Sequence, residues 1–146
     1  MIRRATRADA DAIAAIEVRT FRHAYADILD PHYLAELDPD ARAEEWREAL
    51  DQTDRVVFVA ELGGRVVGYT SVREDGQLRT IYVDPFAQGA GVGTQLLEAA
   101  ERAGARELDV FEANGHGRGF YEARGWHLAG EAGAWLDRPL VKYVKS

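Results

Sequence analysis

The sequence predicts a mixed α/β fold, in which one sheet contains both antiparallel and parallel strands. Two observations predict it. Three short apolar segments between residues 55 and 83 are joined only by tight, glycine-containing turns, and strands joined in this way are antiparallel. From residue 77 to 111 a strand pattern, an amphipathic helical pattern and another strand pattern follow one another, which places the two strands parallel. The length of 146 residues fits one domain, which we assign to residues 1–146.

The elements are expected in the order β-α-α-β-β-β-α-β-α-β-β. Residues 1–6 form a short edge strand, and Asp9 or Asp11 can cap the helix that follows. Residues 20–50 have a helical pattern that two prolines interrupt. The later elements are expected as strands at 55–61, 66–73, 77–83, 106–111, 126–130 and 139–145, and as helices at 91–103 and 114–124.

Composition and charge exclude several kinds of binding partner and reaction chemistry. The formal net charge is −7 and only two lysines are present, so nucleic acid and anionic membranes are not expected partners. The negative charge favours a cationic substrate or serves solubility alone. Without cysteine the chain has no thiolate nucleophile and no zinc–sulfur site. No apolar run approaches the roughly 20 residues of a membrane span, and we expect a cytoplasmic location.

Three glycines at a spacing of two form the most informative motif. Gly89, Gly91 and Gly93 follow an apolar strand and open an amphipathic helix. Glycine lets the backbone approach a ligand closely, and a helix N-terminus carries about half a positive charge. Together these properties predict an anion site, with phosphate as the usual ligand.

Two common phosphate motifs do not fit this loop. A P-loop needs a lysine directly after its last glycine, and none is present here. A dinucleotide fold needs the spacing G-x-G-x-x-G, whereas these glycines are spaced G-x-G-x-G. A glycine-rich loop without a ligand remains an alternative.

The segment 83–93, VDPFAQGAGVG, resembles the acetyl-CoA-binding motif of the GCN5-related N-acetyltransferase (GNAT) superfamily. The segment 107–127 resembles the next strand and helix of that family, with an L-x-V strand, an Asn, and then F-Y-E-x-x-G-aromatic. Asn114 and Tyr121 are seven residues apart, as in the family. The order of the preceding elements also matches, so the resemblance covers nearly the whole chain.

The resemblance implies the GNAT fold and an N-acetyltransferase. Such an enzyme moves an acetyl group from acetyl-CoA, its co-substrate, to a primary amine of a small molecule or peptide, by direct transfer and without a metal. The lack of cysteine agrees with direct transfer. A non-catalytic acyl-CoA-binding module, a hydroxyl acceptor and another acyl donor remain alternatives. A homodimer is compatible with the resemblance.

The resemblance also assigns cofactor-binding residues. In the family, the backbone of the strand before the glycines pairs with the pantetheine arm as an added strand, which maps onto Ile81, Tyr82 and Val83. The pyrophosphate rests on N–H groups of the loop, which maps onto Gly89, Ala90, Gly91, Val92, Gly93 and Thr94. Asn114 is both a cofactor contact in the family and a good helix N-cap. The loop lacks the arginine that the family most often has there.

Tyr121 is the expected catalytic acid. A phenol with a pKa near 10 is protonated at neutral pH and can donate to the departing CoA thiolate; the alternative is a packed helix aromatic. For the base, Asp109 matches a strand carboxylate that acts in some members of the family. His116, Glu61 and Glu74 are further candidates.

Three glycines, at positions 115, 117 and 119, stand at the start of the helix that Asn114 caps. Each costs about 1 kcal/mol relative to Ala in a helix interior. Either this turn is frayed or a neighbour approaches closely, and the adenosine end of the cofactor and a second subunit are the two candidates.

In this family, the N-terminal helical stretch forms a wall of the acceptor pocket. Its aromatic residues Tyr25, Tyr33 and Trp46 either line that pocket or belong to the core. The sequence does not indicate which amine is the acceptor.

Overall fold

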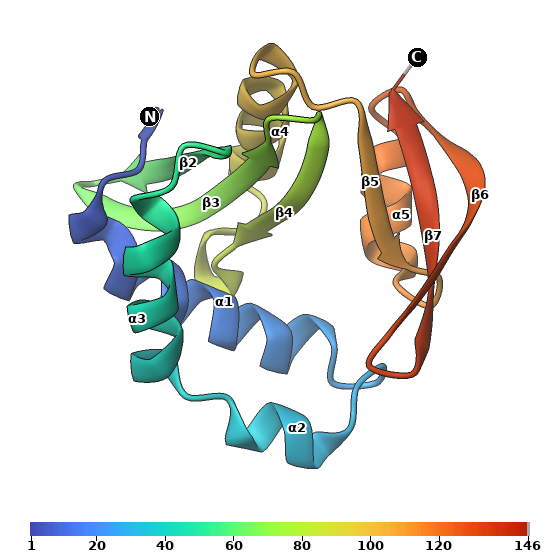
Figure 1. The fold of residues 1–146 in the computed structure, drawn as a ribbon, viewed down its shortest axis with the longest axis horizontal. Helices are drawn as coiled ribbons and strands as arrows, with labels where there is room; N and C mark the ends of the chain where they lie inside the picture. Colours follow the sequence, from blue (N-terminus) through green and yellow to red (C-terminus); the bar gives the residue numbers. More distant parts are fainter. Residues whose placement is uncertain (146) are drawn as a thin grey trace.

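A computed structural model, which describes residues 1–145, contains a seven-stranded mixed sheet with helices on both faces (Figure 1). The strands are β1 (Ile2–Arg4), β2 (Arg55–Leu62), β3 (Arg65–Arg73), β4 (Gln77–Val83), β5 (Glu107–Phe111), β6 (Trp126–Trp135) and β7 (Arg138–Lys145). The helices are α1 (Ala10–Ala24), α2 (Pro31–Glu36), α3 (Pro39–Leu50), α4 (Val92–Arg102) and α5 (Gly115–Glu122), with short 3-10 turns η1 (Arg7–Asp9) and η2 (Pro85–Ala87). The predicted fold class is confirmed.

The sheet has the order β1-β2-β3-β4-β5-β7-β6. Strands β1 to β4 are antiparallel neighbours, as the tight turns predict, and β4 and β5 are parallel, as the strand–helix–strand unit predicts. Both glycines of the β2–β3 turn, Gly63 and Gly64, have positive φ, which is the conformation that a two-residue hairpin turn requires.

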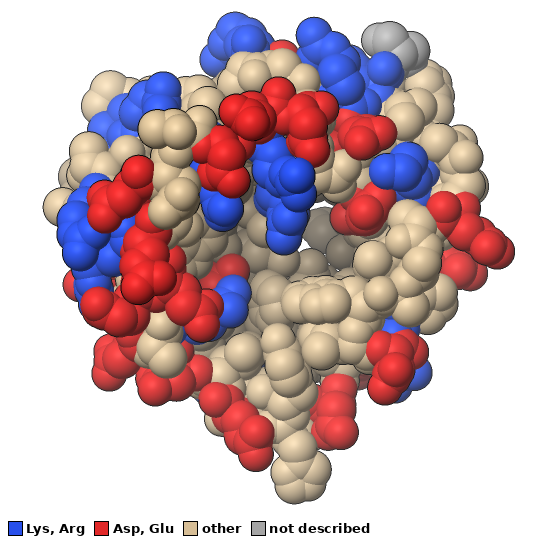
Figure 2. Space-filling model, in the orientation of Figure 1, with Lys and Arg blue, Asp and Glu red and all other residues tan. Residues whose placement is uncertain are grey.

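The parallel pairing of β4 and β5 is short, and this opens the sheet. Only two pairs join them, Gln77 with Glu107 and Leu78 with Leu108. Arg79 is an extra residue in the register between β3 and β4, and such a bulge bends its strand. Strands β4 and β5 therefore diverge (Figure 1), and the molecular surface is hollowed between them (Figure 2).

Four clusters of buried side chains hold the helices to the sheet. Helices α1 and α3 pack on one face, where Ile13 and Trp46 contact Val59 and Tyr69 of the sheet in one cluster. On the other face, Leu96 of α4 packs with Val67 of β3. A further cluster joins α4, β5, β7 and the start of β6, and the side chains of α5 pack against it. The two halves of the sheet thus share one layer of helices, α4 and α5, behind the opening.

Two elements differ from the expectation. Pro31 and Pro39 interrupt the helical stretch as expected, but each also begins a new helix, capped by Asp30 and Asp38, so three helices precede β2 where two were expected. Proline is favoured in the first helical turn because its missing N–H has no acceptor there. Strand β6 continues beyond residue 130, because register shifts near its glycines let the ladder resume. No helix within residues 1–145 is long and apolar enough to cross a membrane.

Candidate active site

The edge of β4 that faces the opening presents backbone hydrogen-bonding groups. The N–H of Asp84 donates to the carbonyl of Val67 in β3 at 2.7 Å. Residues of an antiparallel ladder alternate in the side to which their N–H and C=O groups point. Those of Tyr82 therefore point to β3, whereas those of Ile81 and Val83 point into the opening. An extended ligand with amide groups can pair with this edge.

The edge of β4 is followed, after η2 and a glycine-rich loop, by the N-terminus of α4. Gly89 and Gly91 adopt φ of +90° and +78°, and no described atom beyond their chain neighbours lies within 4 Å of where a side chain would start. The first helical hydrogen bond runs from the Gln95 N–H to the Gly91 carbonyl at 3.2 Å. The N–H groups of the three residues between them therefore have no helical acceptor. These N–H groups can bind an anion, as the glycine spacing predicts for residues 89–94, which we call the anion loop.

Asp84 holds the turn between β4 and this site. Its carboxylate is buried, accepts a hydrogen bond from the Phe86 N–H at 3.2 Å, and lies 2.6 Å from the Arg19 guanidinium of α1. The ion pair connects α1 to the loop across the end of the sheet. The Asp-Pro pair marks this turn in the sequence, but no local pattern indicates Arg19 as its partner.

Tyr121 lies behind the opening, half-buried on α5. Its ring contacts the rings of Phe120 and Trp126, with centroids 5.3 and 6.0 Å away. Its hydroxyl has no hydrogen-bond partner within residues 1–145. Burial raises the pKa of this phenol above its usual value, and the Tyr25 phenol adds to the effect. Tyr121 is therefore protonated at neutral pH and able to donate a hydrogen bond to a ligand.

Asp109 lies on β5 at the point where β4 and β5 separate. It follows Leu108, the last β5 residue that pairs with β4. Its carboxylate lies 3.3 Å from the Lys142 ammonium of the neighbouring strand β7, and its side chain is one-third exposed. Phe111, two residues on, packs with Phe21 of α1, so the face that Asp109 shares with Phe111 is turned toward α1.

The sequence matches a known protein family. Residues 14–126 match the family model described as "Acetyltransferase (GNAT) family". The chain belongs to the GNAT family. It is 30% identical to a probable N-acetyltransferase, Rv2775, of Mycobacterium tuberculosis, over 95% of this chain and 85% of that protein.

Solved structures agree with this family. Apo YjaB from Escherichia coli has a TM-score of 0.80 and 25% identity, and the match covers 99% of this chain and 95% of that one. The putative acetyltransferase yncA from Salmonella typhimurium, solved with its cofactor acetyl-CoA, has a TM-score of 0.71 and 26% identity, over 100% of this chain and 94% of that one. The predicted GNAT fold is confirmed, and acetyl-CoA is the cofactor of a structural relative.

The helix after β5 begins with the N-cap that Asn114 predicts. The Asn114 side chain caps α5 by accepting from the Gly117 N–H at 2.9 Å. A β-carbon at Gly117 would lie 2.6 Å from the Asn114 amide nitrogen. At Gly117 the cap itself is a close neighbour, and the first turn is helical rather than frayed. Around Gly115 and Gly119, no described atom beyond the chain neighbours and the backbone of α5 lies within 4 Å of an added β-carbon.

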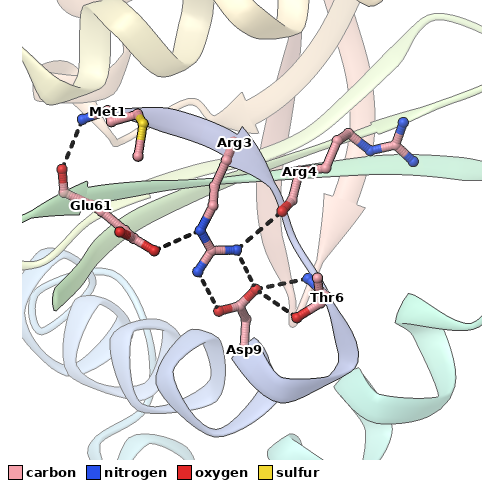
Figure 3. A network of polar contacts seen from close by, with 6 residues as sticks. All are labelled: Met1, Arg3, Arg4, Thr6, Asp9 and Glu61. Carbon is pink, nitrogen blue, oxygen red and sulfur yellow. Dashed lines mark hydrogen bonds and ion pairs between the residues drawn. The ribbon is translucent and has the colours of Figure 1, made fainter. Parts of the chain in front are cut away.

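Glu61, one of the candidate bases, belongs to a structural network at the far edge of the sheet (Figure 3). The Arg3 guanidinium lies 2.6 Å from Glu61 and donates two hydrogen bonds of 2.8 Å to Asp9. These bonds hold the pKa of Asp9 below its usual value. Since β1 and β2 are separated from the opening by β3 and β4, Glu61 is not placed to act there.

The other polar candidates lie on the surface. Glu74 is exposed in the turn between β3 and β4, next to the end where β4 and β5 are paired, and His116 is exposed in the first turn of α5. Asp109 is the candidate carboxylate that the structure brings to the opening. Within residues 1–145 no group of three or more His, Asp or Glu side chains is placed to hold a metal ion.

Of the three aromatic residues of the N-terminal helices, Tyr25 and Trp46 are buried in the core and Tyr33 packs against it. Trp46 is buried against Tyr69, and its indole N–H donates to the buried Glu17 at 3.3 Å, which makes it a core residue. The Tyr25 hydroxyl lies 3.3 Å from that of Tyr82 on β4. Tyr33 packs against the cluster that contains Tyr25. Tyr25 is thus a buried core residue as well, packed between α1 and β4.

Gly93 and Thr94 contact α5 and the turn that follows it. A β-carbon at Gly93 would lie 3.3 Å from the Phe120 ring, so this glycine lets α4 and α5 approach closely. The Thr94 hydroxyl accepts a 3.0 Å hydrogen bond from Arg124. The sequence did not single out Arg124, because only the packing of the two helices brings it to the anion loop.

Proposed function

We propose that this GNAT protein transfers the acetyl group of acetyl-CoA to a primary amine, within a ternary complex. The observation that carries the proposal is the open edge of β4, followed after the Asp84 turn and the glycine loop by the unpaired N–H groups of α4. One edge and one helix N-terminus thus offer consecutive sites for an amide-bearing arm and for the phosphates attached to it.

The residues at these two sites fit coenzyme A. Backbone groups of Ile81 and Val83 match the amides of a pantetheine arm, which would lie beside β4 as an added strand. The space above Gly89 and Gly91 admits a pyrophosphate close to the backbone. When bound, acetyl-CoA supplies a thioester that carries the acetyl group.

Tyr121 is the proposed acid. Its hydroxyl is protonated and has no partner within residues 1–145, so it can donate a hydrogen bond to the departing sulfur without breaking a bond inside the protein. This arrangement stabilises developing negative charge at little reorganisation cost.

Asp109 is the proposed base that takes a proton from the acceptor ammonium, directly or through one water molecule. Its support is its place at the point of separation of β4 and β5. The Lys142 ammonium at 3.3 Å orients its carboxylate. Once the amine is neutral it has the lone pair that attack on a thioester requires.

A cationic amine is the acceptor class that we favour. The chain carries a net charge of −7, and Asp and Glu side chains lie on several sides of the hollow in Figure 2. The half-buried ring of Tyr82 lies on the α1 side of β4, where it contacts Phe21, and an aromatic ring attracts a cation.

Release of free CoA tests the proposal. The protein has no cysteine, so a thiol reagent reports CoA without background from the protein. Acetyl-CoA would be offered with polyamines, aminoglycosides and lysine-containing peptides, and mass spectrometry would locate the added acetyl group on nitrogen. We expect turnover with at least one cationic amine. Tight acetyl-CoA binding without turnover on the whole panel would favour a non-catalytic acyl-CoA-binding module instead, and a product acetylated on oxygen would favour a hydroxyl acceptor.

A further inference from the structure

The anion loop has no positive side chain of its own. Residues 80–101 contain neither lysine nor arginine. The pyrophosphate of coenzyme A carries two negative charges, and backbone N–H groups with a helix dipole supply about half a unit of positive charge. A cation from another part of the chain would complete the site.

Arg124, in the turn after α5, reaches this loop. Its Nε donates to the Thr94 hydroxyl at 3.0 Å, and Thr94 is in the first turn of α4. Its Nη1 donates to the Phe120 carbonyl at 2.9 Å, and its guanidinium carbon lies 3.9 Å above the Phe120 ring. Phe120 in turn packs on Gly93. The guanidinium is therefore held beside the unpaired N–H groups of α4 by two hydrogen bonds and a ring contact.

The charge of Arg124 is not neutralised by the protein. Within residues 1–145 no carboxylate lies within ion-pair distance of it, whereas Arg19 and Arg42 each contact a buried carboxylate. Its Nη2 has no acceptor among the described residues. Two N–H donors of this nitrogen, and one more on Nη1, remain for a ligand.

We propose that Arg124 binds the pyrophosphate of coenzyme A and takes the place of the arginine that the loop lacks. This inference rests on the proposed function. A guanidinium is planar, and its paired N–H groups match two oxygens of a phosphate. Because the Phe120 ring and Thr94 already hold the side chain, little entropy is lost when the phosphate binds. The Thr94 hydroxyl, which accepts from Arg124, keeps its own hydrogen for a phosphate oxygen.

A charge-removing pair of variants tests this assignment. R124Q removes the guanidinium beside the loop. R102Q removes the same charge from an exposed position in the last turn of α4, and serves as the matched control. Affinities for CoA and for 3′-dephospho-CoA would be measured by titration calorimetry at several salt concentrations, after circular dichroism and thermal unfolding have verified the fold.

We expect R124Q to lose about 10- to 100-fold in affinity for both ligands alike, as removal of charge-assisted hydrogen bonds to a phosphate does. The difference from the wild type should shrink as salt rises, because salt screens the lost attraction. R102Q should bind as the wild type does. The affinity of R124K, which keeps the positive charge but lacks the planar guanidinium, should lie between the affinities of the wild type and R124Q.

Three results would overturn the assignment. Unchanged affinity in R124Q would remove Arg124 from the cofactor site. A loss for CoA alone would move its contact to the 3′-phosphate, and a loss that is independent of salt would make Arg124 a structural clamp between α4 and α5. If the wild-type protein binds neither ligand, the proposed function fails together with this inference; the three results above leave the proposed function intact.

Discussion

The Asp84 carboxylate lies 2.6 Å from the Arg19 guanidinium and caps the turn that leads from β4 to the anion loop. Arg19 belongs to α1, so this pair connects the helix beside the opening with the loop that we propose to hold the cofactor phosphates. The Asp84 side chain is 2% exposed and that of Arg19 is 41% exposed. The carboxylate therefore depends on this pair, whereas the guanidinium also contacts solvent.

Replacement of Asp84 by Asn should destabilise the protein and weaken cofactor binding. We expect a loss of about 1–3 kcal/mol in the free energy of unfolding, because a buried charged hydrogen bond is removed. Urea denaturation measures it. D75N removes an exposed partner of Arg73, 3.0 Å away, and should change the stability by less than about 1 kcal/mol. Equal effects of the two variants would contradict a special role of Asp84.

Replacement of Tyr121 by Phe should lower turnover by about 100-fold or more, the usual contribution of a positioned acid. The affinity for acetyl-CoA should change little. Tyr143 provides the control, since it lies in the same core cluster and its hydroxyl contacts Arg118 and Glu122. Y143F should keep the kcat of the wild type. Full turnover of Y121F would remove Tyr121 from the reaction.

The pH profile of turnover gives a second test of Tyr121. A phenol donates a proton only below its pKa, and burial raises the pKa of Tyr121 above its usual value of about 10. The fall in rate caused by loss of this proton should therefore occur above pH 10. An alkaline fall in kcat near pH 8 that disappears in Y121F would contradict the raised pKa.

Gly91 and Gly64 form a matched pair of glycines. Both have φ of +78° and open space where a side chain would start. G91A and G64A should each cost about 1–2 kcal/mol of stability, because an L-residue is strained in this conformation. Only G91A should also lose CoA affinity, since Gly91 is in the proposed phosphate site. G93V should both destabilise the protein and weaken binding, because its side chain meets Phe120.

The Arg3–Asp9 pair should make the stability depend on acid pH. Arg3 lowers the pKa of Asp9, so the pair stabilises the folded state above pH 4 or so, and this contribution is lost as pH falls through the lowered pKa. D9N should therefore be less stable than the wild type at pH 7, by about 1–2 kcal/mol, and the difference should shrink toward pH 2. D54N, which removes an exposed charge beside Arg55, is the control. Urea unfolding at several pH values measures both.

Local patterns in the sequence predicted much of the fold. Period-two and helical apolar spacing located the strands and helices, and glycine-rich turns set the antiparallel half of the sheet. Two details escaped those patterns. Pro31 and Pro39 break the helical stretch as expected, but the sequence pattern did not show that each also begins a new helix. The bulge at Arg79 leaves no clear signal in the sequence, yet it lies where β4 stops pairing with β5.

By itself the sequence determined the fold class and the GNAT family and predicted an anion site, because each depends on residues that are near one another along the chain. The tertiary structure alone decided which distant side chains meet at that site. It removed Glu61 from the candidate bases by pairing it with Arg3, brought Asp109 to the opening, and carried Arg124 across to Thr94. Such contacts arise from the packing of α4 on α5 and of helices on the sheet, and no local spacing encodes them.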